Sequence, residues 1–386
     1  MKFETYTMED ALEEIIDYRG KTPKKSDSGI PTLSAKSVKN NHIDYSLCYY
    51  ISPDEYKHFM VRGFPKVGDV LLTTEAPMGM VARLDRDDIG IAQRLLTLRG
   101  KTGVLDNEYL LYFLQSSIGQ SLLKARETGT TVTGIKQAEF RKIQIDIPEI
   151  SVQKKIGGIL RSLDQKIEIN NKINKNLLEQ ATALYKYRFI ELQPFNGTMP
   201  DDWHLGTVSE IIELHDSKRI PLSSRERADL AKIYPYYGAT SVMDYVDRYL
   251  FDGIYLLLGE DGTVVDSKGF PILQYVEGKF WVNNHAHIIT GRNGFSVELL
   301  YLLFSLTSVQ SIVTGAVQPK ISQANLNKVP IIIPSEAELK AFDATIQPIF
   351  TQIRNLRAEN DRLATTRDTL LPKLLSGELD VSNIDL

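Results

Sequence analysis

The sequence predicts an α+β protein in which two similar α/β modules alternate with two long helices that pair as an antiparallel coiled coil. Residues 129–148 and 315–334 match at a constant offset of 186, with eight identical positions. At the same offset, both segments continue into long stretches in which apolar residues recur at alternating steps of four and three. A period this long indicates a duplicated domain rather than a solenoid repeat.

The composition is that of a globular protein with room for more than one core. The chain has 386 residues, of which 42% are hydrophobic, and its formal net charge is −4; these values favour two or three domains. A single cysteine, Cys48, excludes an intrachain disulfide and a cysteine-rich metal site. The first residues do not resemble a signal or transit peptide, and no apolar run approaches a membrane span. We therefore expect a soluble, cytoplasmic protein.

Each half of the chain contains a short α+β module. Apolar runs rich in β-branched residues alternate with turn signals, and one apolar-periodic segment in each half predicts a helix. The predicted strands are 68–74, 94–98 and 142–147 in the first module, and 253–259 and 287–290 in the second. The predicted helices are 107–116 and 298–305. The resulting domain boundaries give residues 1–148, 149–195, 196–334 and 335–386.

A seam of apolar residues follows each module. The first seam comprises Ile156, Leu160, Leu163, Ile167, Asn170, Asn174, Leu177, Ala181 and Leu184. The second comprises Phe342, Ile346, Ile349, Ile353, Leu356, Asn360, Leu363, Arg367 and Leu370. Such a seam, sustained for about four heptads, predicts a coiled coil, and an asparagine within it commonly fixes the register at a cost in stability.

The second helix has a clear predicted start and two predicted irregularities. Ser335 and Glu338 have the spacing of a capping box. At ~1.5 Å per residue, roughly 40 residues make a rod of about 60 Å. Two rods from one chain most simply pack against each other, antiparallel if the modules are related by a twofold. Pro348 predicts a kink near Gln347, and Pro372 predicts a break before the tail.

The motifs of catalysis and cofactor binding are missing from the sequence. Gly20-Lys-Thr and Gly100-Lys-Thr lack the first glycine of a phosphate-binding loop. His285-Ala-His287 lacks a third ligand at metal-site spacing, so polar recognition or a structural role is favoured. The carboxylates around Asp261 and Asp266 fit a turn better than a nuclease centre. We therefore expect no catalytic residue, no metal and no cofactor.

Several segments, taken in their order along the chain, resemble the specificity subunits of type I restriction-modification systems. The resemblance covers essentially the whole chain. It is carried by residues 134–148 and 153–167, by 30–39 and 73–79 in the first module, by 236–240, 258–263 and 281–284 in the second, and by the ending Leu370-Leu-Pro-Lys-Leu-Leu-Ser-Gly-Glu-Leu379. Pro348 and the charged Arg367 depart from a regular seam.

This resemblance implies a DNA-binding subunit without catalytic function. Two target-recognition domains would each read half of a split, asymmetric site in double-stranded DNA. The helices would act as a ruler and dock two adenine methyltransferase subunits, which restriction (motor-nuclease) subunits would join. The sequence leaves two alternatives open: the DNA-recognition subunit of another two-chain restriction-modification enzyme, and a coiled-coil scaffold that does not bind DNA.

Local basic patches and polar loops indicate where DNA would bind. Residues 19–39 carry six cations against one aspartate, and a weaker patch lies at residues 218–227. Lysine and arginine suit phosphates, while side chains with paired donors and acceptors suit base edges. The residues expected to contact DNA are Arg19, Lys21, Thr22, Lys24, Ser34, Lys36, Thr130, Thr131, Thr133 and Lys136 in the first module, and Lys218, Arg219, Tyr236, Tyr237, Asn284, His285, Gln318 and Lys320 in the second.

Overall fold

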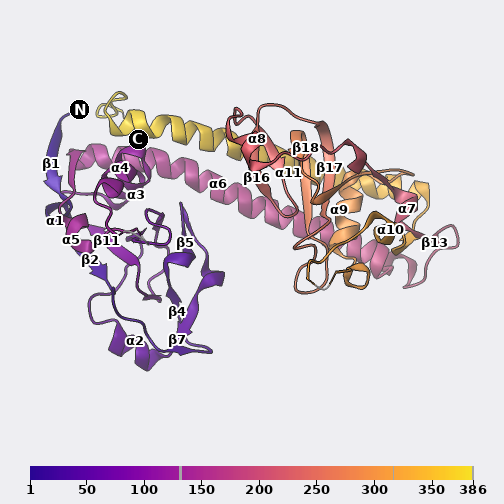
Figure 1. The fold of residues 1–386 in the computed structure, drawn as a ribbon, viewed down its shortest axis with the longest axis horizontal. Coiled ribbons are helices and arrows are strands. Elements are labelled where there is room, and N and C mark those ends of the chain that lie inside the picture. Colours follow the sequence, from indigo (N-terminus) through magenta and orange to yellow (C-terminus); the bar gives the residue numbers. More distant parts are fainter. Residues whose placement is uncertain (130–132, 316, 385–386) are drawn as a thin grey trace. The chain divides into compact units, whose positions relative to one another are not determined.

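The computed structural model describes residues 1–129, 133–315 and 317–384. They form two compact units (Figure 1). Unit 1 comprises Met1–Glu168 together with Asn360–Leu386, and unit 2 comprises Ile169–Glu359. Each unit therefore contains one α+β module and one end of each long helix. Among the described residues, no helix is both long and apolar enough to cross a lipid bilayer.

Module 1 contains two four-stranded sheets and two smaller strand pairs. The central sheet has the order β2(Leu12–Asp17), β11(Leu95–Gly100), β8(Val70–Thr73), β9(Val81–Arg83). The second sheet has the order β10(Gly90–Ile91), β4(Ile30–Leu33), β7(Tyr49–Ile51), β3(Lys25–Ser26). The pairs are β1(Phe3–Thr7) with β12(Gln144–Pro148) and β5(Val38–Lys39) with β6(His42–Ile43). The helices are α1(Met8–Ala11), α2(Pro53–Phe59), α3(Asn107–Gln115), α4(Ser117–Ala125) and α5(Gln137–Arg141).

Module 2 repeats this plan around one larger sheet. Its six strands have the order β14(Ile212–Leu214), β19(Ala286–Gly291), β17(Phe251–Gly259), β18(Leu273–Val282), β15(Tyr234–Tyr237), β16(Val242–Val246). A separate pair joins β13(His204–Thr207) and β20(Pro330–Ile333). The helices are α7(Val208–Ile211), α8(Ser224–Ala228), α9(Val297–Ser305) and α10(Gln323–Leu326). All seven elements predicted within the modules are present, with ends shifted by at most two residues.

The duplication is visible in the backbone hydrogen bonds themselves. Ile135 donates to the carbonyl of Thr74 at 3.0 Å, and Ile321 donates to that of Glu260 at 2.8 Å. Both partners of the second bond lie 186 residues after those of the first. The bridges between Thr128 and Gly134 and between Glu75 and Gly134 recur as Thr314 with Lys320 and Asp261 with Lys320. The segments 128–134 and 314–320, apart from residues 130–132 and 316, which lie outside the described residues, therefore occupy the same place in each module and are named here the return loops.

The long helices are α6(Ile150–Tyr185) and α11(Glu336–Leu375). α6 continues as a π-helical segment, Lys186–Ile190. α11 is helical throughout, including at Pro348 and Pro372. The break predicted at Pro372 is therefore wrong: the neighbouring Leu374 and Leu375 are buried in the core of unit 1, and this packing offsets the hydrogen bond that proline cannot donate.

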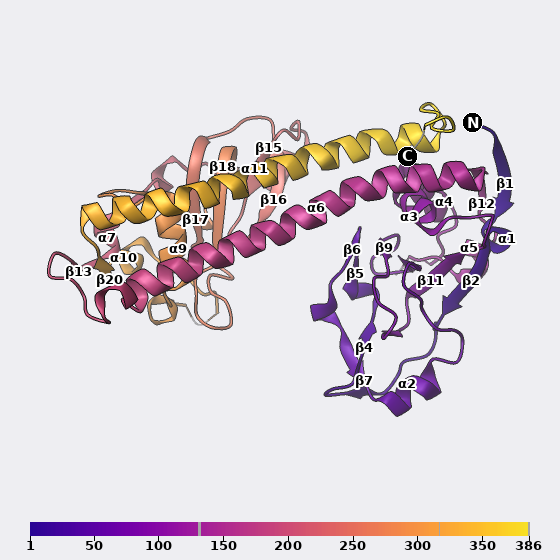
Figure 2. The ribbon, with the colours of Figure 1, turned by 180° about the vertical axis from the view of Figure 1, so that it is seen from behind.

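In each unit the two helices run side by side and antiparallel (Figure 2). In unit 1, Asp164 pairs with Arg367 at 2.6 Å, and Lys155 donates to the carbonyl of Ser382 at 2.7 Å. In unit 2, the rings of Tyr185 and Phe342 lie 5.9 Å apart, and Asn170 donates to Glu359 at 2.9 Å. In both units the residue number rises along one helix as it falls along the other.

The seam residues differ in burial. The buried members are Ile156, Leu160, Asn170, Ala181, Phe342, Ile346, Ile353 and Leu356. The half-buried members are Leu163, Ile167, Asn174, Leu177, Ile349, Asn360, Leu363, Arg367 and Leu370. Leu184 is 40% exposed, so its place in the seam is a wrong prediction. Tyr185 and Phe189 are buried instead, in one aromatic cluster with Phe342.

The positive charge of the seam residue Arg367 is paired with a carboxylate within unit 1. Its guanidinium pairs with the buried Asp164, whose other carboxylate oxygen accepts a 2.6 Å hydrogen bond from the Tyr112 hydroxyl. Burial and this bond to Asp164 raise the pKa of Tyr112 far above its ordinary value. Arg367 thus fastens α11 to α6, and Asp164 fastens α6 to α3. Also in unit 1, the amino group of Met1 lies 2.8 Å from the carboxylate of Asp380.

Two neighbouring glycines in α6 give a test of how closely the helix lies on module 1. A Cβ atom on Gly157 would lie 2.9 Å from the Cβ of Glu108, whereas one on Gly158 would meet nothing within 4 Å. We expect Gly157→Ala to lower the free energy of unfolding by about 1–3 kcal/mol through overpacking. Gly158→Ala should raise it by about 0.5–1 kcal/mol through helix propensity. Urea denaturation of both variants decides this, and equal effects would contradict the close approach.

Candidate nucleic-acid interface

The candidate interface of module 1 lies where β8 ends and β11 begins. Glu75 follows β8, and its carboxylate lies 2.6 Å from Nε of Arg94 and 4.0 Å from Nη2 of Arg19. Glu75 also bridges the return loop at Gly134. Three predicted contacts, Arg19, Thr133 and Lys136, thus lie together on this side of the module, and all three are exposed. We call this part of the module edge 1.

Four of the other predicted contacts in module 1, Lys21, Thr22, Lys24 and Lys36, are also exposed. Lys21, Thr22 and Lys24 follow Arg19 as exposed residues. Ser34 is half-buried and Lys36 is exposed, on the turn that follows β4. Thr130 and Thr131 lie outside the described residues.

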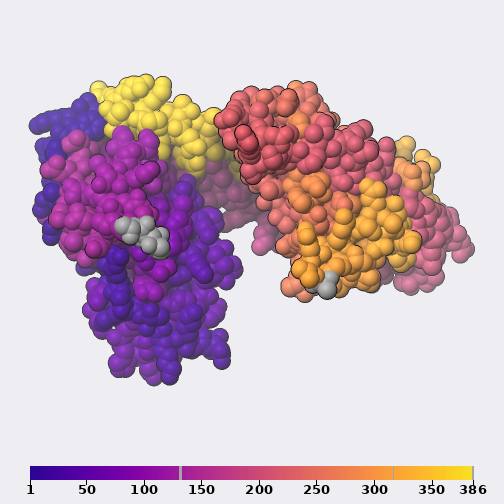
Figure 3. All heavy atoms as spheres, viewed as in Figure 1, coloured from indigo at the N-terminus to yellow at the C-terminus, as the bar shows by residue number. Residues whose placement is uncertain are grey.

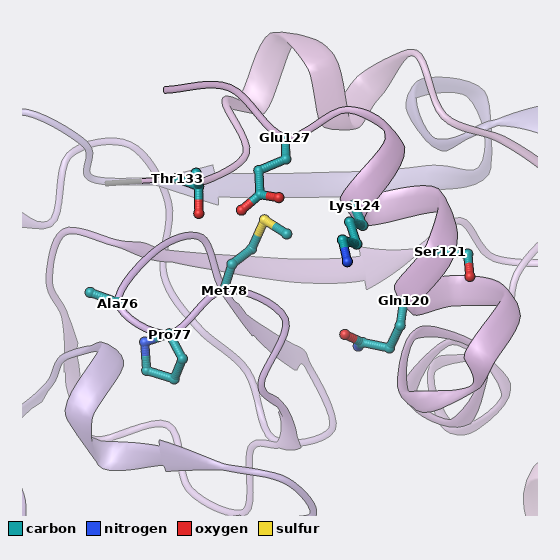
Figure 4. Close-up of a pocket in the computed structure, with 8 residues that line it drawn as sticks. All are labelled: Ala76, Pro77, Met78, Gln120, Ser121, Lys124, Glu127 and Thr133. Carbon is teal, nitrogen blue, oxygen red and sulfur yellow. The ribbon is translucent and has the colours of Figure 1, made fainter. Parts of the chain in front are cut away.

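A surface hollow of about 630 Å³ lies beside the return loop of module 1 (Figure 4). Ala76, Pro77 and Met78 line it on the side of the β8 loop. Gln120, Ser121 and Lys124 line it from α4, and Glu127 and Thr133 complete it. Gln120 ties the two sides together by donating to the carbonyl of Gly79 at 2.9 Å. The hollow is open to solvent, so it enlarges the surface available at edge 1 and does not enclose a small ligand.

Module 2 carries the same arrangement, named edge 2, at the end of β17. Asp261, which lies 186 residues after Glu75, is 2.5 Å from Nδ1 of His285, the residue that precedes β19. In the return loop, Nζ of Lys320 lies 3.2 Å from the carboxylate of Glu260. In both modules, therefore, an acid that follows one central strand pairs with a basic residue that precedes a neighbouring strand of the sheet. Glu75, after β8, pairs with Arg94, before β11; Asp261, after β17, pairs with His285, before β19.

A charge network is buried behind edge 2. His287 is fully buried; its Nε2 lies 2.8 Å from the carbonyl of Ile321, and its Nδ1 lies 2.6 Å from Asp216. Burial by itself raises the pKa of Asp216, but the hydrogen bond and charge of His287 outweigh it and hold that pKa below its ordinary value. Burial also opposes ionisation of Glu260, whose pKa is nevertheless lowered by Arg219 and His287.

Asp216, Glu260 and His287 offer ligand atoms within 4.8 Å of one another, a spacing that a metal ion could use. Protein groups already face these atoms. Arg219 lies 2.6 Å from Glu260 and 3.5 Å from Asp216, and the carbonyl of Ile321 requires a proton on Nε2 of His287. The arrangement is therefore that of an internal salt-bridge network.

One predicted DNA contact in module 2, Tyr236, is enclosed in the structure, and a second, Arg219, is held in ion pairs. Tyr236 is 1% exposed, and its hydroxyl oxygen accepts a 2.9 Å hydrogen bond from the amide of Leu222. Side chains alternate along a strand, and Tyr236 is the one that faces inward. The side chain of Arg219 is 14% exposed and pairs with the two carboxylates described above, so its contact with DNA stays a prediction.

The remaining predicted contacts of module 2 are accessible. Lys218, Asn284, Gln318 and Lys320 are exposed, and Tyr237 and His285 are half-buried. Figure 3 shows the orange surface of unit 2, which includes the neighbourhood of the return loop, facing solvent. The ion pairs of Glu75 and Asp261 were not predicted. Their signal in the sequence is an acid two residues after a buried strand, at the same repeat position in both modules.

Comparisons with known proteins find the same two-module organisation as the fold. The model of the type I restriction modification DNA specificity domain matches residues 4–179 and 200–364. The MjaIX specificity subunit of Methanocaldococcus jannaschii is 26% identical, over 92% of this chain and 88% of its own. The HindI specificity subunit of Haemophilus influenzae is 21% identical, over 81% and 87%. The crystal structure of a type I S subunit from M. genitalium aligns with a TM-score of 0.55 at 17% identity, over 97% and 96%.

The class defined by these observations is that of non-catalytic DNA-recognition proteins built from two repeated modules. The chain belongs to the family of type I restriction-modification specificity subunits.

Proposed function

We propose that each module reads one half of a split site in double-stranded DNA, and that the helices dock two adenine methyltransferase subunits, which restriction subunits then join. In this proposal residues 1–148 and 196–334 are the target-recognition domains, and α6 and α11 set their spacing. The observation that supports it is the repetition of one edge: each module places an acid–base pair beside the described residues of its return loop, of which Thr133 and Lys320 are exposed.

The electrostatics of the edges suit a polyanion despite the negative net charge of the chain. The carboxylates of Glu75 and Asp261 would repel phosphates, but Arg94 and His285 lie against them. Exposed lysines on the neighbouring loops are then free to neutralise phosphates and fix the register. Exposed amides such as Asn284 and Gln318 have the paired donor and acceptor that an adenine edge requires.

An exposed apolar stripe in unit 2 supports the docking part of the proposal. Ile169, Ile173 and Leu184 are all exposed, and at 100° per residue they fall within an arc of about 60° on α6. Tyr187 and Ile190 continue as exposed apolar residues in the π-helical segment. Apolar side chains at this spacing are typical of a helix face that packs against another helix.

The test uses the chain assembled with its methyltransferase partner. Mapping methylated adenines in the host genome, with and without this gene, identifies the site. The complex is then titrated against that site and against one with a base pair added to the spacer. One base pair moves a half-site by ~3.4 Å and turns it by roughly a tenth of the helical repeat, so we expect affinity to fall at least tenfold.

A base substitution within the spacer, at unchanged length, is the matched control and should leave affinity unchanged. Equal affinity for the lengthened site would contradict a split site read by two spaced modules. Failure of the chain and the methyltransferase to co-elute would contradict the docking part.

A further inference from the structure

One turn occupies the same place in both modules although it does not follow the main repeat offset. In module 1 the amide of Ala92 donates to the carbonyl of Leu33 at 2.9 Å, and in module 2 the amide of Asn283 donates to that of Tyr237 at 3.0 Å. Ala92 and Asn283 each precede by two residues the basic residue of the edge, Arg94 or His285. Leu33 and Tyr237 are therefore equivalent.

The residues that follow these two positions form the turns. Residues 34–37 form a 3-10 turn in which the amide of Ser37 donates to the carbonyl of Ser34, whereas residues 238–241 form the tip of the β15–β16 hairpin, in which the amide of Gly238 donates to the carbonyl of Ser241; both bonds are 2.9 Å long. The two segments differ in backbone conformation but share their place in the module. Aligned on this basis, residues 30–37 read IPTLSAKS and residues 234–241 read YPYYGATS. Proline, alanine and serine coincide at an offset of 204. This alignment places Lys36 opposite Thr240, and both are exposed.

The turn of module 2 is held against edge 2. The side chain of Gln274 donates to the carbonyl of Gly238 at 2.9 Å. A Cβ atom on Gly259, the last residue of β17, would lie 3.4 Å from the carbonyl oxygen of Ala239. The residues after Gly259 are Glu260 and Asp261, so the turn lies next to the return loop that these residues contact.

We propose that this turn contacts DNA in each module, through Lys36 in module 1 and Thr240 in module 2, and that Thr240 is a specificity-determining residue. The inference rests on the proposed function and deepens it. Lysine presents a point charge on a flexible stem, which suits a phosphate. Threonine presents a hydroxyl and a methyl group on a stiff side chain, which suits a base edge and the methyl group of thymine. The equivalent turns thus position the DNA in module 1 and read it in module 2.

The test exchanges the two residues in the assembled complex. Lys36→Thr should lower the slope of log affinity against log salt by about one unit and weaken matched and mismatched sites equally. Thr240→Lys should raise that slope by about one unit and reduce the preference for one base pair of a half-site about tenfold. Thr240→Val, which keeps the shape but loses the hydroxyl, should reduce the preference without changing the slope.

Matched controls carry the same substitutions elsewhere in each module. Lys101→Thr changes an exposed lysine at the opposite end of β11 from Arg94, and Thr198→Lys changes an exposed threonine in the loop before β13. If neither Thr240 variant alters base preference more than Thr198→Lys does, the inference is overturned while the proposed function stands. If the wild-type complex itself does not discriminate between sites, the proposed function fails as well.

Discussion

Replacement of Arg354 with leucine is expected to lower the free energy of unfolding by about 3–5 kcal/mol, because it leaves a buried carboxylate without its cation. Nη1 of Arg354, on α11, lies 2.8 Å from Glu298, which is buried on α9. The hydroxyl of Tyr275 donates to the same carboxylate at 2.5 Å. This network attaches module 2 to α11, so the loss should be seen as a lower urea midpoint.

Two variants control this result. Arg357→Leu removes an exposed guanidinium that lies 5.8 Å from the Tyr275 ring, and should cost under about 1 kcal/mol. Adding Glu298→Gln to Arg354→Leu removes the unpaired charge and should recover part of the stability. If Arg357→Leu cost as much as Arg354→Leu, the buried charge would not be the cause.

Asp216→Ala is also expected to lower the free energy of unfolding by about 3–5 kcal/mol, through contacts that lie within module 2. It leaves the fully buried His287 and the amide of Ile288, now 2.9 Å from the carboxylate, without their acceptor. Asp252→Ala, at an exposed aspartate of β17, is the control and should change stability little. Equal losses would show that the buried network does not stabilise the module.

The same network predicts how the free energy of unfolding changes with pH. The pKa values of Asp216 and Glu260 in the folded protein lie below their ordinary values. Their ionised forms therefore stabilise the fold at pH values above the unfolded pKa of about 4, and that stabilisation is lost as the pH falls below it. In Asp216→Ala the contribution of Asp216 is absent, so stability should decline less between pH 5 and 3 than in the wild type.

The sequence predicted best those features that depend on local pattern. Buried strands such as β8 and β17, and the helices α3 and α9, follow from short apolar runs at the period of each element. The seam was less reliable at its ends: Leu184 follows the repeat, but the π-helical segment after Tyr185 changes which side chains face inward. The break predicted at Pro372 was wrong because the cost of proline in a helix was considered without the packing of Leu374 and Leu375.

The candidate site was only partly predictable, because exposure and pairing depend on three-dimensional neighbours. Tyr236 and Tyr237 are adjacent and chemically alike, but only Tyr236 is enclosed. Arg219 is one of several cations in a basic segment, and only the fold shows that it lies between Asp216 and Glu260. The equivalence of Lys36 and Thr240 was hidden because insertions between the strands change the offset from 186 to 204.

The ion pair between Met1 and Asp380 suggests a rearranged variant of the chain. The segment that follows α11 thus lies beside the start of β1 within unit 1. A short peptide joining the two ends, with new ends opened in the exposed loop at Asn196 and Gly197, would give a coding order of module 2, helix, module 1, helix. The buried contacts of both units would be unchanged. We therefore expect this permuted variant to fold into the same two units.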